Sequence, residues 1–544
     1  MASKLRSEQL SRAQSQVFDV VVIGGGITGA GIALDAVTRG LSVCLVEQYD
    51  FAHGTSSRST KLIHGGLRYL KQLELGLVRT VGRERRVVYQ AAPHLVRPIE
   101  MLLPLYKGGS LGAVSTRLAL WIYDRLAEVD KAERFRMLQA KEVLSKVPEL
   151  NPEGLLGGAA YTEYRTDDAR LVIANLVSAR KSGACCLNYL KVQQLHYDSG
   201  QVSGVHCLDL LDNSEIIVRG KKVVAAAGPW ADELRTMDES EAKPMIRHSK
   251  GVHLVFDAST IPVQQAIYTD VPGDARMIFI VPRGNKVYVG TTDTFYNGDI
   301  AQPGLEVADV GYLISALQAI FPTLSISEKD IDSSWSGIRP LLAKPGKAPG
   351  ELSRKDEVLV THSGLICIMG GKLTGYRHMA EKVIDKVVDK LGLEASAYKC
   401  KTKGMPLEGF ISDDAIVPYI HRMYGEAKQV GFQLEDIQQL VYTYGTSVEK
   451  IIEHAYDLYA DYSDVSERLL MAELRYGLGE EMVQNVSDFL IRRTGMLYFN
   501  RSKAMAIYRK VAAMIGQHLN QSVATVEEGI AFFEAAAAQT VDIS

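Results

Sequence analysis

Two short apolar runs stand near the start of the chain. Val20–Ile23 is rich in β-branched residues, and Leu41–Val46 is a second run of similar length. Such runs are typical of strands that are buried on both faces of a parallel sheet. A helix is expected between them, over about Thr28–Thr38, and Gly40 is expected to end it. The pattern therefore predicts a strand–helix–strand unit.

Three glycines occupy the turn between the first strand and this helix. Gly24, Gly26 and Gly29 have the spacing G-x-G-x-x-G, and Glu47 stands at the end of the second strand. In a dinucleotide-binding unit the glycines allow a tight turn, close approach to a pyrophosphate and close helix–strand contact, and the carboxylate accepts ribose hydroxyls. The helix N-terminus offers its amides to the phosphates. We therefore expect a dinucleotide site here; the alternative is a tight glycine turn in another α/β unit.

Along the rest of the chain, the pattern of apolar and polar residues predicts first both helices and strands, then mainly strands, and finally only helices. A helix over Asp167–Arg180, a short strand ending at Lys191–Val192 and a hairpin from Val205–Asp209 and Glu215–Arg219 are expected first. Alternating residues between 245 and 294 predict an antiparallel sheet. A single strand over residues 358–371 is expected to lead into an amphipathic helix. After a polar linker at 401–409, helices are expected over Asp413–Tyr424, Glu435–Tyr444, Val448–His454, Val465–Gly477, Asp488–Thr494 and Ala504–Asn520.

Composition narrows the class of protein. The 544 residues are 47% hydrophobic and 23% charged, which suffices for two or three domains or subdomains. A net charge of −3 gives no indication of nucleic-acid binding. The six cysteines lack metal-ligand spacing and fit a reducing, cytosolic setting. The first 17 residues lack the apolar core of a secretory signal, and no apolar run is long enough to span a membrane.

One segment mixes hydroxyl groups, glycines and cations in an unusual way. Residues 53–70 read HGTSSRSTKLIHGGLRYL, with apolar residues interleaved among the polar ones. A solvated loop does not need this mixture, whereas a segment beneath a phosphate-bearing cofactor and its substrate does. His64 alone also fits a buried structural histidine.

This segment closely resembles the flavin-contacting signature of the FAD-dependent (aerobic, respiratory) glycerol-3-phosphate dehydrogenases. The opening IGGGITGAGIALDA and the later strings APHLVRP, TDDARLV, WSGIRPL and GGKLTGYR fit the same family. The resemblance therefore covers essentially the whole chain. Residues 222–230, KVVAAAGPW, also favour FAD over NAD, because small residues at a strand end allow a large planar group to approach the backbone. No second G-x-G-x-x-G is present for a separate nicotinamide.

The resemblance implies an α/β fold of the glutathione-reductase-like or D-amino-acid-oxidase-like class. A Rossmann-like FAD-binding domain is expected to combine with an antiparallel β substrate domain and an α-helical C-terminal domain. The FAD-dependent oxidoreductase region is expected over residues 17–400, with FAD-binding parts at about 17–80, 157–230 and 355–395 and the interleaved substrate sheet at about 240–350. Residues 401–544 are expected to form the helical cap domain.

The resemblance also implies the residues that hold FAD. Noncovalent binding is expected, and covalent attachment through His64 or a cysteine is left open. The expected cofactor contacts are Gly24, Gly26, Ile27, Thr28, Gly29, Glu47, Thr55, Ser56, Ser57, Lys61, Leu62, His64, Gly65, Val192, Ala227, Gly228, Trp230, Gly337, Arg339, Gly371, Lys372, Leu373 and Thr374.

The implied reaction is oxidation of sn-glycerol 3-phosphate to dihydroxyacetone phosphate, with hydride passing from C2 to flavin N5. Arg339 is expected near the substrate O2, where its charge stabilises alkoxide character. His253 is the candidate base, although it also fits a structural histidine on a sheet face. Lys372 completes the catalytic set. The expected substrate contacts, which hold the phosphate and the hydroxyls, are Arg68, Tyr69, His253, Arg339, Arg354, Lys372 and Thr374.

The resemblance implies a membrane quinone as electron acceptor and a cytoplasmic protein held peripherally on the inner face of the cell membrane. Leu111–Leu126 is dense in apolar and aromatic residues, and it fits either an ordinary core helix or a membrane-contact surface. A homodimer is left open.

Two alternative functions are considered. One is an oxidase on the same scaffold that makes hydrogen peroxide, although no insertion typical of family oxidases is evident. The other is a non-enzymatic FAD-binding protein.

Overall fold

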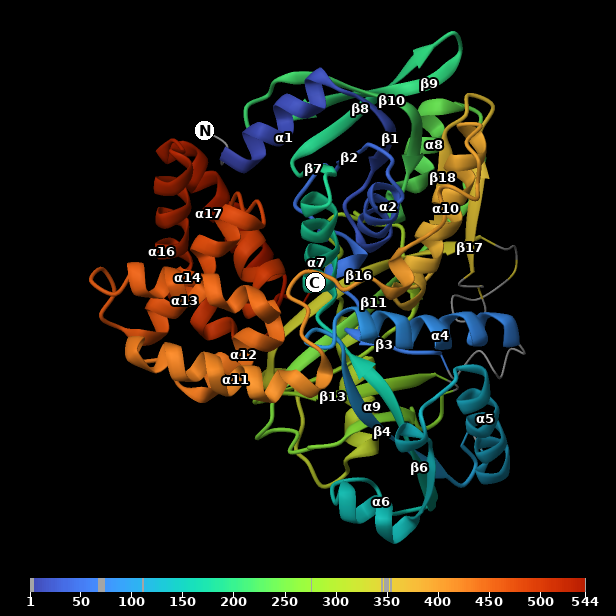
Figure 1. Cartoon of the computed structure of the whole chain (residues 1–544). Helices are drawn as coiled ribbons and strands as arrows, with labels where there is room; N and C mark the ends of the chain where they lie inside the picture. The colour runs from blue at the N-terminus through green and yellow to red at the C-terminus, as the bar shows by residue number, and fades with distance from the viewer. Residues whose placement is uncertain are drawn as a thin grey trace.

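Two β-sheets form the centre of the protein, and a layer of helices from the C-terminal part of the chain packs on one side (Figure 1). The computed structural model describes residues 4–66, 74–109, 112–274, 276–343, 346, 352 and 355–543. The α/β fold class expected from the sequence, with an antiparallel sheet and a helical C-terminal part, is confirmed.

The smaller sheet carries the glycine turn. β1 pairs in parallel with β2 and β10, β2 pairs in parallel with β7, and β10 pairs in parallel with β18. β17 closes one edge antiparallel to β18, and β9 and β8 extend from β10 as antiparallel strands. The strands span Val17–Ile23 (β1), Val43–Val46 (β2), Cys185–Leu187 (β7), Leu190–Asp198 (β8), Gln201–Asp209 (β9), Glu215–Ala225 (β10), Asp356–Val360 (β17) and Ile366–Gly370 (β18).

Both faces of this sheet are covered, which explains the continuous apolar runs. Val20 and Val22 of β1 pack in one core with α2 (Ile27–Thr38), α7 (Asp168–Lys181) and α10 (Tyr376–Lys390). Val21 and Ile23 point to the opposite face, where α1 (Lys4–Ser15) and α8 (Ala231–Asp238) contribute to a second core. The predicted strand–helix–strand unit is therefore confirmed as β1, α2 and β2.

The larger sheet is mainly antiparallel. The sheet expected over residues 245–294 is confirmed, and strands from three further regions extend it. β12 and β4 form a parallel pair within it. The strands span Leu62–Ile63 (β3), Arg97–Tyr106 (β4), Arg136–Gln139 (β5), Leu155–Arg165 (β6), Ile246–Asp257 (β11), Ala266–Asp270 (β12), Met277–Arg283 (β13), Lys286–Gly290 (β14), Thr294–Phe295 (β15) and Ile331–Leu342 (β16).

Three predictions of strand limits were wrong. The second strand of the predicted hairpin and the KVVAAA strand are one element, β10, because Gly220 marks a close approach to Val21 and not a strand end. β8 continues six residues past Val192 to Asp198. The single strand expected over 358–371 is a hairpin of β17 and β18, whose turn contains Gly364 with φ +85°.

Among the described residues, four helices connect strands of the larger sheet, and the C-terminal unit is helical as expected. The first set is α4 (Leu75–Ala91), α5 (Ala113–Leu126), α6 (Ala140–Lys146) and α9 (Val307–Ile320). No helix in the described ranges is both long and apolar enough to cross a bilayer. The C-terminal helices are α11 (Asp413–Ala427), α12 (Leu434–Tyr444), α13 (Val448–Asp457), α14 (Val465–Glu480), a π-helix (Asp488–Arg493), α15 (Met496–Phe499), α16 (Arg501–Leu519) and α17 (Val523–Ala538).

A buried ion-pair cluster joins the helical unit to the smaller sheet. Asp50, which follows β2, accepts hydrogen bonds from Arg492 at 2.5 Å and from Arg493 at 2.7 and 2.9 Å. All three side chains are buried. Removing one member of such a cluster leaves uncompensated charge, so the cluster fixes how the helical unit docks.

Candidate active site

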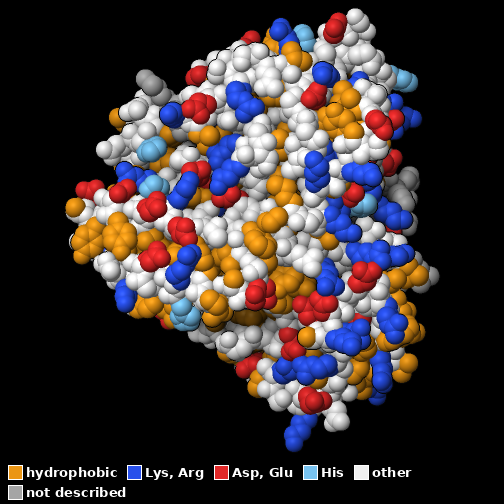
Figure 2. All heavy atoms as spheres, in the orientation of Figure 1, with side chains coloured by type: hydrophobic (Ala, Val, Ile, Leu, Met, Phe, Trp, Pro, Cys, Tyr) orange, Lys and Arg blue, Asp and Glu red, His pale blue; other side chains and the backbone are white. Residues whose placement is uncertain are grey.

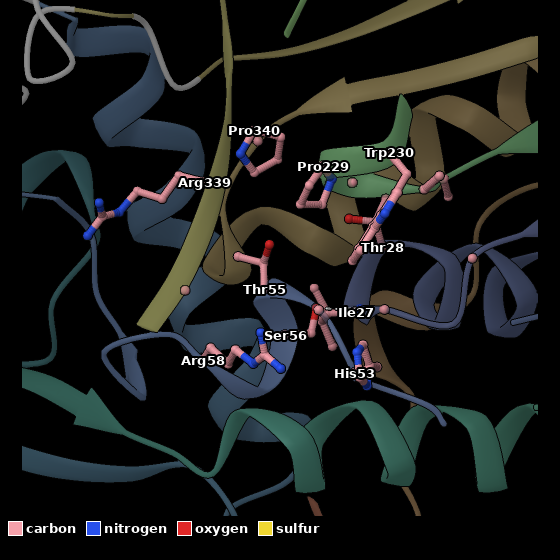
Figure 3. A pocket seen from close by; sticks show the side chains of 18 of the residues that line it. Ile27, Thr28, His53, Thr55, Ser56, Arg58, Pro229, Trp230, Arg339 and Pro340 are labelled. Atoms are coloured by element: carbon pink, nitrogen blue, oxygen red, sulfur yellow. Dashed lines mark hydrogen bonds between the residues drawn. The ribbon is translucent and has the colours of Figure 1, made fainter. Parts of the chain in front are cut away.

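A cavity of about 310 Å³ opens at the carboxyl ends of β1 and β2 and extends to β11 and β16 of the larger sheet. Its walls come from the glycine turn, the polar segment 53–64, the start of β8, residues 226–237 and the start of the helix after β18. Figure 3 shows Ile27, Thr28 and Ser56 together at one wall, with Arg339 projecting from β16. Ligands of open α/β sheets bind at this end of the strands.

Two of the three glycines of the turn occupy positions that a side chain would disfavour, and the third lines the cavity. Gly24 has φ +112°, a conformation that side chains disfavour. A Cβ at Gly29 would lie 1.9 Å from the carbonyl oxygen of Gly24, so only glycine allows α2 to pack this closely. Gly26 lines the cavity and precedes the first turn of α2. The backbone is thus shaped to approach a pyrophosphate at the helix N-terminus.

Glu47 and Ser56 are fixed around this turn. Glu47 accepts the amide of Gly25 at 2.6 Å and the amide of Tyr49 at 2.9 Å, and burial raises the pKa of its carboxyl. Ser56 Oγ accepts the amide of Ile27 at 3.0 Å. Both residues line the cavity, so a carboxylate and a hydroxyl are available there to contact a dinucleotide.

Small residues and one aromatic ring form a further wall. Val192, Ala227, Gly228 and Trp230 all line the cavity. A Cβ at Gly54 would lie 3.0 Å from the Trp230 ring, so the indole packs against the backbone of the polar segment. This wall can hold the flat adenine end of a dinucleotide.

His253 lies at the other end of the cavity. Its ring stacks on Trp335 with centroids 4.8 Å apart, and Nε2 lies 3.0 Å from Thr60 Oγ1. Nδ1 is buried and has no hydrogen-bond partner among the described residues. Burial, together with the nearby charges of Arg339 and Lys61, holds the pKa of His253 well below 6.5. The imidazole is therefore neutral at neutral pH.

Arg339 is oriented by the loop that follows β14. Its guanidinium donates to Thr291 Oγ1 at 2.8 Å and to the Thr292 carbonyl at 3.2 Å, and it lies 3.2 Å from Asp293 Oδ1. The side chain is largely buried and lines the cavity. These contacts fix one positive charge close to His253.

Thr374 joins the start of the last helix of the smaller sheet to the polar segment. Its hydroxyl accepts the amide of His64 and donates to the carbonyl of His64, both at 3.1 Å. Gly371, Lys372 and Leu373 line the cavity beside it, and a 3₁₀ turn over Leu373–Gly375 precedes α10. The helix therefore begins at Tyr376, four residues later than the sequence predicts, and the 3₁₀ turn brings these backbone groups to the cavity.

The arrangement fits FAD. A glycine cradle, a helix N-terminus and a buried carboxylate lie at one end of a single cavity, and a neutral histidine and a fixed arginine lie at the other. The lining residues that could hold the adenosine and pyrophosphate are Gly24, Gly26, Ile27, Thr28, Glu47, Ser56, Val192 and Ala227. Those that could contact the isoalloxazine are Thr55, Leu62, His64, Gly337, Gly371, Lys372, Leu373 and Thr374, all of which line the cavity.

Four of the expected cofactor residues do not line the cavity. Gly29 lies beneath the glycine turn, and Ser57 is buried. Lys61 Nζ pairs with Asp168 Oδ1 at 2.5 Å and so supports the polar segment from behind. The Gly65 amide donates to the Tyr123 hydroxyl at 3.1 Å. Three expected substrate residues, Arg68, Tyr69 and Arg354, lie outside the described residues.

The sequence interpretation also missed residues that line or support the cavity. His53, Arg58, Thr60 and Gly251 are lining residues, and Asp293 orients Arg339. Arg58 and Thr60 belong to the polar segment already singled out, so that segment contained the signal. The GTTDT string that begins at the last residue of β14, with a glycine, hydroxyls and an acid, was a second signal.

Comparison with known proteins agrees with this geometry. The family profile described as "FAD dependent oxidoreductase" matches residues 19–377, and that described as "C-terminal domain of alpha-glycerophosphate oxidase" matches residues 400–526. The chain is 46% identical to the aerobic glycerol-3-phosphate dehydrogenase of Staphylococcus epidermidis over 93% of this chain and 91% of that protein. It is 46% identical to the protein of the same name from Bacillus subtilis, over 91% of this chain and 90% of that one.

A solved structure is similar over nearly the full length. The glycerol-3-phosphate dehydrogenase from Bacillus halodurans, solved in complex with FAD, superposes with a TM-score of 0.85. The two sequences are 37% identical, and the match covers 99% of this chain and 98% of that one.

Proposed function

Because the chain belongs to the FAD-dependent oxidoreductases, and within them to the aerobic glycerol-3-phosphate dehydrogenase family, we propose that it oxidises sn-glycerol 3-phosphate to dihydroxyacetone phosphate. The observation that carries the proposal is the joint presence, in one cavity, of a dinucleotide cradle and of the pair His253 and Arg339. Bound FAD supplies the acceptor for the hydride that leaves substrate C2.

His253 takes the proton of the substrate C2 hydroxyl. The ring is neutral and can accept a proton, and its stacking on Trp335 fixes its plane. Its lowered pKa makes it a weak base in the free protein. A substrate phosphate dianion nearby would raise that pKa, because an opposite charge favours the protonated ring.

Arg339 stabilises the negative charge that develops on substrate O2 as the proton leaves. Its guanidinium is already held by Thr291 and Asp293, so little reorganisation is needed during the reaction. Lys372, with Arg68 and Arg354, is proposed to bind the phosphate group, and Tyr69 and Thr374 to donate hydrogen bonds to the substrate. The two charges of the phosphate call for more than one cation.

Membrane quinone is the electron acceptor that we propose. α5 carries Val114, Leu118 and Trp121 on one face with 85%, 57% and 49% of their surfaces exposed, and Arg125 packs 5.1 Å from the Trp121 ring centroid. Figure 2 shows apolar and basic side chains interspersed over this region. An exposed apolar face with aromatic and basic residues suits a helix lying on a lipid surface. The protein would then be cytoplasmic and peripheral to the membrane.

The acceptor is tested by following electrons during turnover with glycerol 3-phosphate. We expect rapid reduction of a soluble quinone analogue and little hydrogen peroxide, even when only oxygen is supplied. Peroxide formed at a rate equal to substrate oxidation in air, and unaffected by the quinone, would identify an oxidase.

A further inference from the structure

A second hollow, of about 500 Å³, lies between the larger sheet and the helical unit. Its walls come from β4, β6 and β13 on one side and from α12, α14 and residues 493–503 on the other; Figure 1 shows α12 near β13. None of the described residues that line this interdomain cavity also lines the active-site cavity. It is therefore a separate place for a ligand.

Three arginines from the larger sheet meet in the interdomain cavity. Arg97 of β4 and Arg165 of β6 are direct partners in the antiparallel register, so their side chains leave the same face of the sheet. Arg283 joins them from the end of β13. Like charges placed directly opposite one another destabilise a sheet, so this arrangement has a cost in the empty protein.

Carboxylates compensate only one of these charges. Arg283 pairs with Asp167 at 2.9 Å. Across the part of the chain that the structure describes, neither Arg97 nor Arg165 forms an ion pair, and Arg97 instead lies 3.6 Å from the ring centroid of Tyr442. Burial and the charge of Arg165 lower the pKa of Arg97 to about 10, and burial with Arg283 lowers the pKa of Arg165.

Three further acids line the interdomain cavity, Glu435 and Asp436 of α12 and Glu473 of α14. Asp436 accepts the amide of Gln433 at the start of α12, and Glu435 is exposed at the same helix end. Burial raises the pKa of Glu473 to about 7, so this side chain is only partly charged at neutral pH. Lys503, which donates to Ser466 in the same wall, adds a further cation.

We propose that the interdomain cavity is a second anion site, which binds a small phosphate-bearing molecule through Arg97, Arg165 and Arg283. Within the arginine cluster itself, three guanidinium groups and the Asp167 carboxylate sum to two positive charges, the charge that a phosphate monoester dianion neutralises. Arginine forks suit this ligand because each can donate two parallel hydrogen bonds to phosphate oxygens. Tyr442 and Tyr288 also line the cavity and supply aromatic surface for the rest of the molecule.

The site also adjoins the polar segment of the active site. Thr166 follows Arg165 and donates its amide to the Lys61 carbonyl at 2.9 Å. Asp168, two residues further on, pairs with Lys61 and accepts the Ser59 amide at 2.9 Å. A ligand that draws Arg283 away from Asp167 would therefore change the contacts of a residue adjacent to Asp168. Asp168 in turn positions Ser59 and Lys61 of the polar segment.

The position of the ligand is tested with tungstate, an anomalously scattering phosphate analogue, soaked into crystals of the FAD-loaded protein. We expect an anomalous peak among Arg97, Arg165 and Arg283 in the wild type and none there in Arg165→Gln. Absence of this peak in the wild type at saturating tungstate would overturn the proposal, even if a peak occupies the active site.

Thermal unfolding with inorganic phosphate at constant ionic strength separates binding from a structural role. In phosphate-free chloride buffer we expect Arg165→Gln to unfold at the same temperature as the wild type or higher, because a like-charge contact is removed. The apparent Kd of the variant for phosphate should be about tenfold higher or more, because one charge-assisted pair is lost. Arg136→Gln, which alters an exposed arginine of the same sheet paired with Glu100, is the control and should behave as wild type. Equal destabilisation of Arg165→Gln with and without phosphate would show a structural role and overturn the proposal.

Discussion

Arg339 and Asp293 form an ion pair of 3.2 Å at the wall of the active-site cavity, although 46 residues separate them in the chain. Arg339 lies on β16, and Asp293 lies in the loop between β14 and β15. Thr291 and Thr292 of the same loop accept from the other guanidinium nitrogen. The fork of the arginine is thus used to hold its position while its charge faces the cavity.

Replacing Arg339 by lysine should reduce turnover about 100-fold, the cost of losing one positioned transition-state donor. A lysine ammonium is a single compact charge and cannot contact Thr291, Thr292 and Asp293 together. The FAD content of the purified variant should stay near that of the wild type. Arg247→Lys alters an exposed arginine of the neighbouring strand β11 and serves as the control. Near-normal turnover in Arg339→Lys would contradict the role given to this residue.

The pH dependence of kcat/KM should report the lowered pKa of His253. Only the neutral ring accepts a proton, so the activity that depends on it is present above its pKa and lost below it. Because burial and two cations hold this pKa well below 6.5, activity should persist as the pH falls through 6.5 and decline only at more acid pH. An acid limb centred at 6.5 or higher in the wild type would argue against His253 as the base.

His253→Gln provides the matched test of the same assignment. It should lower kcat/KM about 100-fold or more, the usual contribution of a general base, and remove the acid limb. His362→Gln, at an exposed histidine, should leave both the rate and its pH profile unchanged.

Trp121→Asp should weaken binding to vesicles of anionic phospholipid about tenfold, because an exposed aromatic anchor is replaced by a charge that the lipid repels. Flotation of the FAD-loaded protein with the vesicles measures this. Tyr459→Asp, at an exposed aromatic residue of the helical unit, is the control and should float as the wild type does. Equal flotation of Trp121→Asp and the wild type would contradict the proposal that α5 contacts the membrane.

The dinucleotide end of the site could be predicted from the sequence because the residues that form it are close together in the chain. Gly24, Gly26, Gly29 and Glu47 lie within one strand–helix–strand unit, and short-range spacing determines their contacts. The substrate end depends on pairs that are distant in the chain. Neither the stacking of His253 on Trp335 nor the pairing of Lys61 with Asp168 leaves a local pattern.

Strands were missed where their composition resembles that of loops. β4 contains Pro98 and Pro104, and proline normally argues against a strand within a sheet. β6 begins with two leucines followed by two glycines and two alanines, LLGGAA, so its apolar alternation is weak. β6 nevertheless lies between β4 and β3 in the larger sheet, with β5 also pairing with it, because glycine and alanine allow close packing there.

The most direct test of the central claim is an anaerobic titration of the FAD-loaded protein with sn-glycerol 3-phosphate, followed by the visible absorption of oxidised flavin. We predict stoichiometric bleaching by this substrate, none by sn-glycerol 1-phosphate, and recovery of the band when a quinone analogue is added. A yellow protein whose flavin band is unchanged at saturating sn-glycerol 3-phosphate would retain the fold and the cofactor but contradict the proposed reaction.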